Sequence, residues 1–283
     1  MNPIFIKLKN GKFKVIKSVA EFKRFVEKDN VPENPSDVRY TNGNKKPISF
    51  QESGRVPQIL TLEQIDKLQT FCRMPIKYFN FPGWKKYQTP HGVYYHLDRG
   101  SKVLAMAHLD TVQEKRPFVY DVKEDGTEVL YSPQLDDRLG AWAILDPLYY
   151  LGFDILLTEG EEVGQSTAYW FKESFDRRYN WMFEFDRKGT DVVMYQYHSP
   201  RMKNLLESFD FEVGHGSCSD ISYLEKLECK GFNFGIGYHN NHSMQAYAIM
   251  KDTMSMINKF KIFYRELKDV KLWHRISGER EIE

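Results

Sequence analysis

Four apolar segments of this chain are each followed by residues that can bind a metal ion, and this pattern limits the possible fold more than any other feature. The segments and the residues after them are Val103–Ala107 with His108, Ile155–Leu157 with Glu161 and Glu162, Trp181–Phe183 with Asp186, and Gly231–Gly237 with His242. Short apolar runs of this kind are typical of buried strands in α/β proteins. Where such strands are parallel, their C-terminal ends meet at one edge of the sheet. The sequence therefore predicts an α/β fold with a cluster of candidate metal ligands at that edge.

The adjacent residues Asp136, Asp137 and Arg138 form a further candidate site. They follow the strand-like run Thr127–Ser132 and precede Ala141–Leu151, whose apolar residues recur at helical spacing. By itself the triplet is more typical of a capped helix start than of a ligand, because Asp is a favoured N-cap residue. The other segments around it favour the ligand interpretation.

Imidazole and carboxylate groups in this number suit a pair of divalent metal ions. One carboxylate can bridge two metals that lie about 3.5–4 Å apart. In catalytic sites each metal keeps an open position for water or substrate. The expected site is therefore a two-metal centre that activates water for a hydrolysis reaction.

The order of these blocks resembles the co-catalytic di-zinc exopeptidases, a superfamily of aminopeptidases, tripeptidases, glutamate-type carboxypeptidases and N-acyl amino acid deacylases. The matching blocks are His108-x-Asp110, Asp136-Asp137-Arg138-x-Gly140, Glu161-Glu162-x-Gly164, Asp186 and His242-Ser243. The residues in these blocks are most similar to those of the aminopeptidase branches, and the resemblance spans roughly residues 92–260. The resemblance implies a three-layer α/β/α sandwich with a mixed central sheet, here with an additional N-terminal embellishment.

The resemblance also implies two bound divalent metal ions. The five ligands that it implies are His108, Asp136, Glu162, Asp186 and His242. Asp136 would bridge the two ions, His108 and Asp186 would complete one site, and Glu162 and His242 would complete the other. Zn²⁺ suits these ligands, although Co²⁺ or Mn²⁺ can occupy sites of the same kind.

Two of the implied ligands have competitors nearby in the sequence. His239 lies three residues before His242, and Glu184 faces the same side of its expected strand as Asp186. We prefer His242 because the serine after it matches the family. Asp186 is preferred because it is nearer the C-terminal end of the strand.

Further residues are expected to act beside the metals. The resemblance implies that Glu161 takes a proton from the attacking water and passes it to the leaving nitrogen, as general base and then general acid. Asp110 would accept the second N–H of the nearby imidazole and so fix its tautomer. The residues expected to contact substrate are Arg138, Asp220 and His215. A plain alternative is that Ser219 or Asp220 simply caps the helix that follows.

An aminopeptidase acting on short peptides is the function that this resemblance favours. An N-acyl amino acid or small-molecule amide deacylase would use the same metals and the same base. An aminopeptidase must receive the free α-amine, for which Asp220 is a candidate. A deacylase often needs a cation for a carboxylate, and Arg138, Arg187 and Lys188 are candidates. The third hypothesis is a catalytically inactive relative that serves as a binding module, because Gln245 stands where many family members carry an acid.

Two regions are expected in the 283 residues, a length that suits one large or two small domains. Residues 1–90 do not match the family pattern and are interpreted as an N-terminal cap or extension of mixed structure. Residues 91–283 are expected to form the di-metal hydrolase domain. The gaps Thr111–Leu135 and Arg187–Asn241 are too short for the lid or dimerisation insert that several branches carry. Oligomers formed in another way are compatible with the sequence.

The composition excludes some classes of partner. The 40 basic and 39 acidic residues give a net charge of +1, which creates no field that attracts nucleic acid or an anionic membrane. No apolar run approaches the roughly 20 residues that span a bilayer. The start of the chain lacks a signal-peptide pattern, and Cys72, Cys218 and Cys229 lack paired spacing. We therefore expect a cytoplasmic protein with reduced thiols, whose partner is a short peptide or an acylated small molecule.

Local patterns predict the remaining elements. Alternation predicts a hairpin from Ile4–Leu8 and Lys12–Lys17, and Thr61–Cys72 is expected to be a helix with Thr61 as N-cap. Between them, Asp29–Pro57 is expected to be a loop. Further helices are expected at Ser18–Lys28, Arg138–Leu151, Gln165–Phe175, Arg201–Ser208, Asp220–Leu227 and Gln245–Leu267. Pro147 should kink the second of these or end it early. The strands expected in the mixed sheet before its βα units are Val93–Leu97, Lys102–His108, Phe118–Val122 and Thr127–Ser132.

Overall fold

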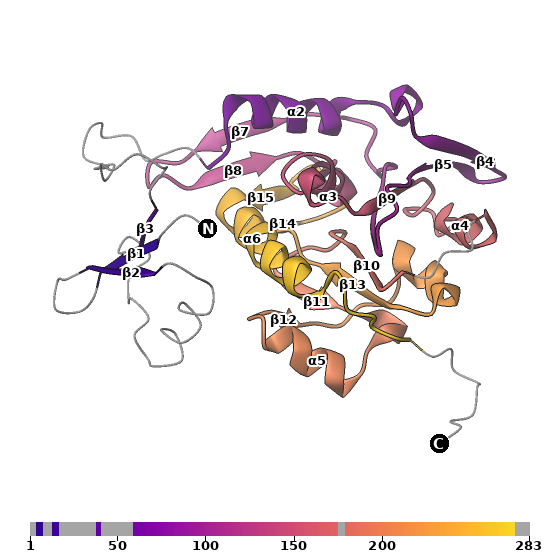
Figure 1. Ribbon diagram of the computed structural model, residues 1–283. Helices are drawn as coiled ribbons and strands as arrows, with labels where there is room; N and C mark the ends of the chain where they lie inside the picture. Colours follow the sequence, from indigo (N-terminus) through magenta and orange to yellow (C-terminus); the bar gives the residue numbers. More distant parts are fainter. Residues whose placement is uncertain (1–3, 8–12, 17–37, 41–58, 175–178, 275–283) are drawn as a thin grey trace, which may run out of the picture. The chain divides into compact units, whose positions relative to one another are not determined.

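The computed structural model describes residues 4–7, 13–16, 38–40, 59–174 and 179–274 (Figure 1). Contacts between α-carbons divide the chain into two compact units, Met1–Val56 and Pro57–Glu283. Each unit is described by itself below. The second unit contains all the candidate site residues.

The first unit contains a three-stranded antiparallel sheet with the order β2-β1-β3. Its strands are β1 (Ile4–Lys7), β2 (Phe13–Ile16) and β3 (Val38–Tyr40). β1 pairs with β2 so that Ile4 faces Ile16 and Lys7 faces Phe13, which confirms the predicted hairpin. The predicted helix Ser18–Lys28 lies outside the described residues, and so does the predicted loop Asp29–Pro57 except for β3.

The boundary between the units lies before residue 57 and not at residue 90 as the sequence suggested. Helix α2 (Leu62–Arg73) begins at the predicted N-cap Thr61, whose hydroxyl accepts a hydrogen bond from the backbone N–H of Gln64 (3.2 Å). The apolar face of this helix is buried at Leu68 and Cys72, so the helix belongs to the core of the second unit. A match to family motifs reveals no such packing, and for this reason the sequence placed the boundary too late.

The second unit is built on an eight-stranded sheet with the order β12-β11-β13-β10-β6-β9-β5-β4. The strands are β4 (Lys85–Thr89), β5 (Gly92–Leu97), β6 (Val103–His108), β9 (Asp154–Thr158), β10 (Trp181–Glu184), β11 (Asp191–Val193), β12 (Glu212–Val213) and β13 (Lys230–Phe234). β13, β10, β6 and β9 are parallel, whereas β5 and β11 are antiparallel to their inner neighbours. The sheet is therefore mixed, as predicted. Every residue of β6 and β9 is buried, as expected for parallel strands covered on both faces.

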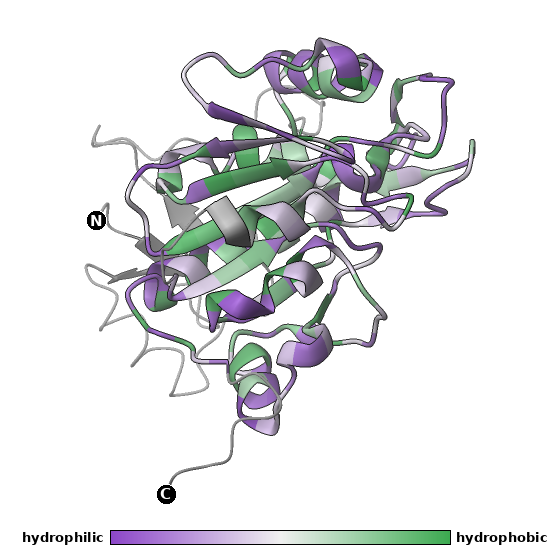
Figure 2. Cartoon of the chain, turned by 90° about the vertical axis from the view of Figure 1, so that its right-hand side faces the viewer, coloured by the Kyte–Doolittle hydropathy of each residue, from purple (hydrophilic) through white to green (hydrophobic). Residues whose placement is uncertain are grey.

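Helices cover both faces of this sheet. Helix α6 (Met250–Leu267) packs on one face, where the rings of Phe183 and Phe260 lie 4.3 Å apart between centroids. The next residue of β10, Glu184, points to the opposite face and accepts a hydrogen bond from the backbone N–H of Ile221 (3.3 Å). Ile221 belongs to the 3₁₀ helix η5 (Asp220–Leu227), which packs beside α4 (Ala168–Ser174). Figure 2 shows hydrophobic residues concentrated on the strands between these layers, which form the predicted α/β/α sandwich.

A second sheet in this unit was not foreseen. It has the order β14-β15-β8-β7 and consists of β7 (Val119–Val122), β8 (Glu128–Tyr131), β14 (Tyr238–His239) and β15 (Tyr247–Ile249). The predicted strands near residues 118–122 and 127–132 therefore form in the expected places but outside the central sheet. The predicted helix from residue 245 begins only at Met250, because Tyr247–Ile249 pairs antiparallel with β8.

The other helices largely match their predicted positions. Helix α3 (Leu135–Leu145) ends two residues before Pro147, in agreement with the predicted early end. Asp136 and Asp137 have non-helical backbone angles, so the regular part of this helix begins after them. The remaining elements are α5 (Pro200–Glu207) and the 3₁₀ helices η2 (Ile76–Tyr78), η3 (Tyr149–Leu151) and η4 (Tyr195–Tyr197). Within the described residues, no helix is both long and apolar enough to cross a membrane.

The three free cysteines differ in burial, which leads to a simple prediction. Cys218 is exposed, whereas Cys72 and Cys229 are buried, and burial raises the pKa of each buried thiol to about 12. Because the thiolate is the reactive form, only Cys218 should react quickly with a thiol reagent in the native protein. Titration with such a reagent should show one fast thiol, and the Cys218→Ser variant should lose that phase. Three equally fast thiols in the native protein would contradict this burial pattern.

Candidate metal centre

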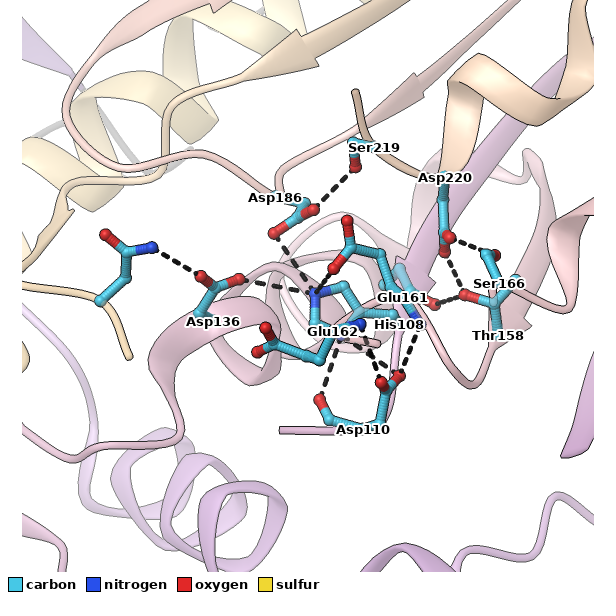
Figure 3. Close-up of polar contacts among 12 residues, drawn as sticks. His108, Asp110, Asp136, Thr158, Glu161, Glu162, Ser166, Asp186, Ser219 and Asp220 are labelled. Atoms are coloured by element: carbon cyan, nitrogen blue, oxygen red, sulfur yellow. Dashed lines mark hydrogen bonds and ion pairs between the residues drawn. The ribbon is translucent and has the colours of Figure 1, made fainter. Parts of the chain in front are cut away.

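Three of the predicted ligands follow parallel strands of the central sheet (Figure 3). His108 is the last residue of β6, Glu162 lies in the loop after β9, and Asp186 lies two residues after the end of β10. Because β6 is paired with both β9 and β10, the C-terminal ends of these strands lie side by side. The expectation that parallel strand ends would bring ligands together is therefore met for these three residues.

The other two predicted ligands reach the same place from the second sheet. Asp136 follows β8, and His242 lies in the turn between β14 and β15. The His242 backbone has a φ of +60°, so the turn that carries it adopts a left-handed conformation. The sequence argument had placed Asp136 after a strand of the central sheet, whereas β8 belongs to the second sheet. His242 does follow the central strand β13, as expected, but β14 comes between them. The two sheets meet at the site, and each contributes ligands.

The carboxylate of Asp136 lies between the two imidazoles. Its Oδ1 atom is 3.5 Å from His108 Nε2, and its Oδ2 atom is 3.0 Å from His242 Nε2. Asp186 Oδ1 lies 3.4 Å from His108 Nε2 on the first side, and Glu162 Oε2 lies 3.0 Å from His242 Nε2 on the second. One carboxylate oxygen thus serves each half of the site, which is the arrangement that a bridging ligand of two metals requires.

Two overlapping groups of these side chains have ligand atoms within 4.8 Å of one another. They are His108 with Asp136 and Glu162, and His108 with Glu161 and Asp186. Both groups contain His108, whereas the short 3.0 Å contact of Glu162 is with His242. We give more weight to this contact and assign Glu162 to the half of the site that contains His242.

Two properties of these residues suit a pair of metal ions: their side chains are metal-binding types, and some of their buried polar atoms lack a hydrogen-bond partner among the described residues. Nε2 of His108 and Oε1 of Glu162 are buried and have no hydrogen-bond partner among the described residues. Burial raises the pKa of Asp186, and the negative charge of Asp136 raises it further. Burial and the same charge raise the pKa of Glu162 to about 7. Bound cations would relieve this repulsion and occupy the unmet nitrogen and oxygen.

Glu161 lies beside the predicted ligands, but it is farther from His108 Nε2 than Asp136 and Asp186 are. Its Oε2 atom is 3.9 Å from His108 Nε2. Burial raises the pKa of Glu161 to about 7, and neighbouring acidic groups contribute to the shift. A carboxylate that lies beside the predicted ligands without making the closest contacts to the imidazole is suited to exchange a proton with water at the site. The geometry therefore favours the predicted role of Glu161 as the general base.

Asp110 links His108 to the loop that carries both glutamates. His108 Nδ1 lies 3.1 Å from the Asp110 carbonyl oxygen and 3.5 Å from its Oδ1 atom. A proton on Nδ1 is held by these acceptors, which leaves the lone pair of Nε2 directed at the site. The Asp110 carboxylate also accepts hydrogen bonds from the backbone N–H groups of Glu161 (3.4 Å) and Glu162 (3.0 Å). The geometry thus favours the predicted orienting role and adds a contact to the loop.

The geometry also separates the competing ligands. His239 stacks on Tyr247 with 5.0 Å between ring centroids, whereas His242 contacts two of the acids in the site. Glu184 is fully buried and is bonded to the backbone N–H of Ile221 on the η5 face of the sheet. These contacts favour His242 over His239 and Asp186 over Glu184.

Two of the three residues expected to contact substrate are buried elsewhere. Arg138 is fully buried over the ring of Phe79, at 4.4 Å from its centroid, and its Nη1 donates to the carbonyl oxygens of Phe71 (2.7 Å) and Met74 (3.2 Å). The predicted substrate contact of Arg138 is therefore not supported. A charged residue next to two aspartates looked like a site residue because the sequence does not show which way a helix faces.

The same holds for Asp220, whose carboxylate is 1% exposed and accepts hydrogen bonds from Thr158 and Ser166. It is not placed to receive a substrate amine. The N-cap of η5 is Ser219, which confirms one of the two caps that the sequence offered for this helix. His215 is exposed in the loop before η5, four residues ahead of Ser219, and its contact with substrate stays a prediction.

Arg138 leads to a stability prediction. Arg138→Met should lower the free energy of unfolding by about 2–4 kcal/mol, because two backbone carbonyls near the end of α2 lose their donor and the ring loses its cation. Urea denaturation measures this change. The KM for substrate should stay the same while the protein is folded. A raised KM with unchanged stability would return Arg138 to the substrate site.

Three further polar residues hydrogen-bond to the predicted ligands; of these, the sequence had pointed only to Ser219, as a residue beside the site or a helix cap. Ser219 Oγ donates to Asp186 Oδ2 (2.8 Å), and Asn241 Nδ2 donates to Asp136 Oδ2 (3.1 Å). Gln113 Nε2 donates to the backbone carbonyl of His242 (2.8 Å). Asn241 could have been suspected because it precedes a ligand. Gln113 is an ordinary polar residue whose partner lies far away in the sequence.

This chain is similar to known proteins in its three-dimensional structure. No protein-family model matches the sequence, and no curated protein matches it. Among solved structures, the Pyrococcus horikoshii TET1 peptidase is 14% identical with a TM-score of 0.51, and the match covers 71% of this chain and 98% of that one. A Staphylococcus aureus tripeptidase is 11% identical (TM-score 0.45; 72% and 91% covered), and the aminopeptidase PepT of Bacillus cereus is 9% identical (TM-score 0.45; 70% and 90% covered). The chain thus has the fold of the TET1 peptidase, as its resemblance to the di-zinc exopeptidases implied.

Proposed function

We propose that this protein is a metal-dependent hydrolase that cleaves an amide bond, and more specifically an aminopeptidase that acts on short peptides. The observation that carries the proposal is the carboxylate of Asp136, whose two oxygens lie beside His108 and His242 respectively. Each half of the site then has one more acid, Asp186 or Glu162. Two imidazoles and three carboxylates in this arrangement are the ligands of a two-metal hydrolytic centre.

The residues of the chain divide the chemistry among them. Bound at these ligands, two divalent ions would polarise the scissile carbonyl and lower the pKa of a water molecule. Glu161 accepts a proton from the attacking water and returns it to the leaving nitrogen. Asp110 keeps the imidazole of His108 in the tautomer that presents Nε2 to the site.

The charges around the site favour an aminopeptidase over a deacylase. Arg187 forms a two-point ion pair with Asp191, with both N···O distances at 2.6 Å, and Arg138 is buried beneath α2. These two candidate cations are therefore engaged within the protein and not presented to a substrate carboxylate. Neither guanidinium is free to pair with the carboxylate of an N-acyl amino acid. Of the candidate cations, Lys188 is the one that the deacylase hypothesis retains.

Assembly of several copies is compatible with this proposal. The TET1 peptidase is described as assembling into a tetrahedron or a large octahedral shell. That property belongs to the relative, and we infer for this chain only that a self-assembled form merits measurement. Sedimentation velocity of the purified protein separates a monomer from a large shell.

Metal analysis followed by a substrate panel tests the proposed function. Protein purified without chelator should contain about two divalent ions per chain, as a co-catalytic site requires. It should then hydrolyse aminoacyl amides and short peptides with a free amine faster than the same compounds with an acetylated amine. Preference for N-acyl amino acids would establish the deacylase alternative. A chain that binds no Zn²⁺, Mn²⁺ or Co²⁺ would be the inactive binding module.

A further inference from the structure

The loop of residues 159–165 carries both Glu161 and Glu162 and is tightly closed. The backbone N–H of Gln165 donates to the carbonyl of Gly160 (2.8 Å), and that of Gly164 donates to the carbonyl of Glu161 (2.8 Å). Gly160 has a φ of +80°, and a Cβ atom there would lie 2.6 Å from the Gln165 carbonyl oxygen. The loop is therefore a compact unit. The positions of its glutamates depend on how its two ends are held.

Asp220 holds both ends of this loop. Thr158, the residue before it, donates its hydroxyl hydrogen to Asp220 Oδ2, and Ser166, the residue after it, donates to Asp220 Oδ1. The carboxylate is 1% exposed, so water does not compete for these bonds. Figure 3 shows the Asp220 carboxylate in contact with both Thr158 and Ser166.

Ser219, the residue before Asp220, contacts a ligand of the other half of the site. Its hydroxyl donates to Asp186 Oδ2 (2.8 Å), while Asp186 Oδ1 faces His108. The backbone N–H of Ile221 donates to Glu184 on β10, which fixes the start of η5 to the central sheet. Of these two consecutive residues, Ser219 thus contacts the predicted ligand Asp186 directly, and Asp220 contacts the two ends of the loop that carries the predicted ligand Glu162.

We propose that Ser219 and Asp220 are positioning residues with separate targets: Ser219 orients Asp186 for the metal held with His108, and Asp220 places the loop that presents Glu162 to the metal held with His242. This inference rests on the proposed two-metal site and adds to it which metal each residue supports. Residues that orient metal ligands in this way typically contribute 10–100-fold to metal affinity.

The test measures metal binding and not activity, in two backgrounds that each keep one half of the site. His242→Ala leaves the half with His108 and Asp186, and Asp186→Ala leaves the half with Glu162 and His242. Co²⁺ alone is the probe, because its visible absorption reports both occupancy and ligand geometry. Ser219→Ala and Asp220→Ala are introduced separately into each background, and the affinity for Co²⁺ is measured by titration.

The two substitutions should have opposite patterns. Ser219→Ala should weaken Co²⁺ binding about 10–100-fold in the His242→Ala background and leave it unchanged in the Asp186→Ala background. Asp220→Ala should do the reverse and should also alter the absorption spectrum of the affected site. Equal losses in both backgrounds would overturn the assignment of separate targets. Unchanged affinity in both backgrounds would overturn the positioning role itself.

Asp154 provides a matched control for the loss of a buried carboxylate. It lies at the other end of β9 and accepts hydrogen bonds from the backbone N–H groups of Arg99 (2.8 Å) and Ser101 (2.9 Å) and from the hydroxyl of Tyr179 (3.0 Å). Asp154→Ala should lower stability without changing Co²⁺ affinity in either background. If it weakened Co²⁺ binding as Asp220→Ala does, general loosening would explain the effect and the proposal would fail.

Two further measurements keep the test decisive. Ser166→Ala removes only one of the two bonds to Asp220 and should give a smaller loss in the same background, even if Asp220→Ala does not fold. The unsubstituted chain must bind about two Co²⁺ ions. If it binds none, the proposed function fails. If the unsubstituted chain binds two ions, and the Ser219, Asp220 and Ser166 variants bind Co²⁺ equally well, only the positioning inference fails.

Discussion

Asp136→Ala is expected to reduce bound metal from about two ions per chain to less than one and to lower kcat/KM by roughly a thousandfold or more. Asp136 is the residue whose carboxylate lies beside both imidazoles, so its removal weakens both halves of the site. A bridging pair of metals supplies several kcal/mol of transition-state stabilisation, and about 4 kcal/mol corresponds to a thousandfold. Elemental analysis and steady-state kinetics on the same preparation measure the two effects.

Asp137→Asn is the matched control for this prediction. Asp137 is adjacent and fully buried, and within the described part of the chain neither of its carboxylate oxygens has a hydrogen-bond partner. It makes no ion pair with either site histidine among those residues, so its variant should retain both metals. Equal metal loss in the two variants would show that the effect comes from the disturbed start of α3 and not from a bridging ligand.

Glu161→Gln should lower kcat by about 10²–10⁴-fold and leave the metal content nearly unchanged. Glutamine has the shape of glutamate but cannot accept a proton from water. Glu161 is farther from the nearest imidazole nitrogen (3.9 Å) than the proposed ligands are, so its charge is not needed to hold the metals. Metal analysis together with kcat and KM for an aminoacyl amide tests the two halves of this prediction.

The control lies in the same loop. Glu159 accepts a hydrogen bond from the backbone N–H of Val93 (3.0 Å), and Glu159→Gln should retain most of the activity. If Glu161→Gln lost metal in proportion to activity, Glu161 would be a ligand and another residue would be the base. Normal turnover by Glu161→Gln would remove it from the mechanism altogether.

The sequence predicted that parallel strands would bring three of the predicted ligands together, and the central sheet has this arrangement. His108, Glu162 and Asp186 each follow an apolar run, and these runs became the adjacent parallel strands β6, β9 and β10. A preference for strand structure and a position just after a strand can both be recognised in a short stretch of sequence. When such strands pair in parallel, the residues that follow them lie close together. For this reason the central sheet and this part of the site could be read from the chain.

Asp136 and His242 also lie at the candidate site, but their route to it was not foreseen. They are carried by β8 and by the turn between β14 and β15, which form a separate antiparallel sheet. β8 and β15 lie more than a hundred residues apart in the sequence. No local pattern states which of two distant strands will pair, because pairing depends on the packing of the whole unit.

The sequence by itself determined the mixed α/β/α architecture, the capped start of α2, the early end of α3 before Pro147 and the residue types of the site. These follow from periodicity, capping and the order of ligand types, which are properties of short stretches. Only the tertiary structure decided that Arg138 and Asp220 are buried, that α2 belongs to the second unit and that Ser219 and Asp220 have different partners. The physical reason is that burial and hydrogen-bond partners are set by contacts between segments far apart in the chain, where a charged residue faces a substrate or a backbone carbonyl according to packing alone.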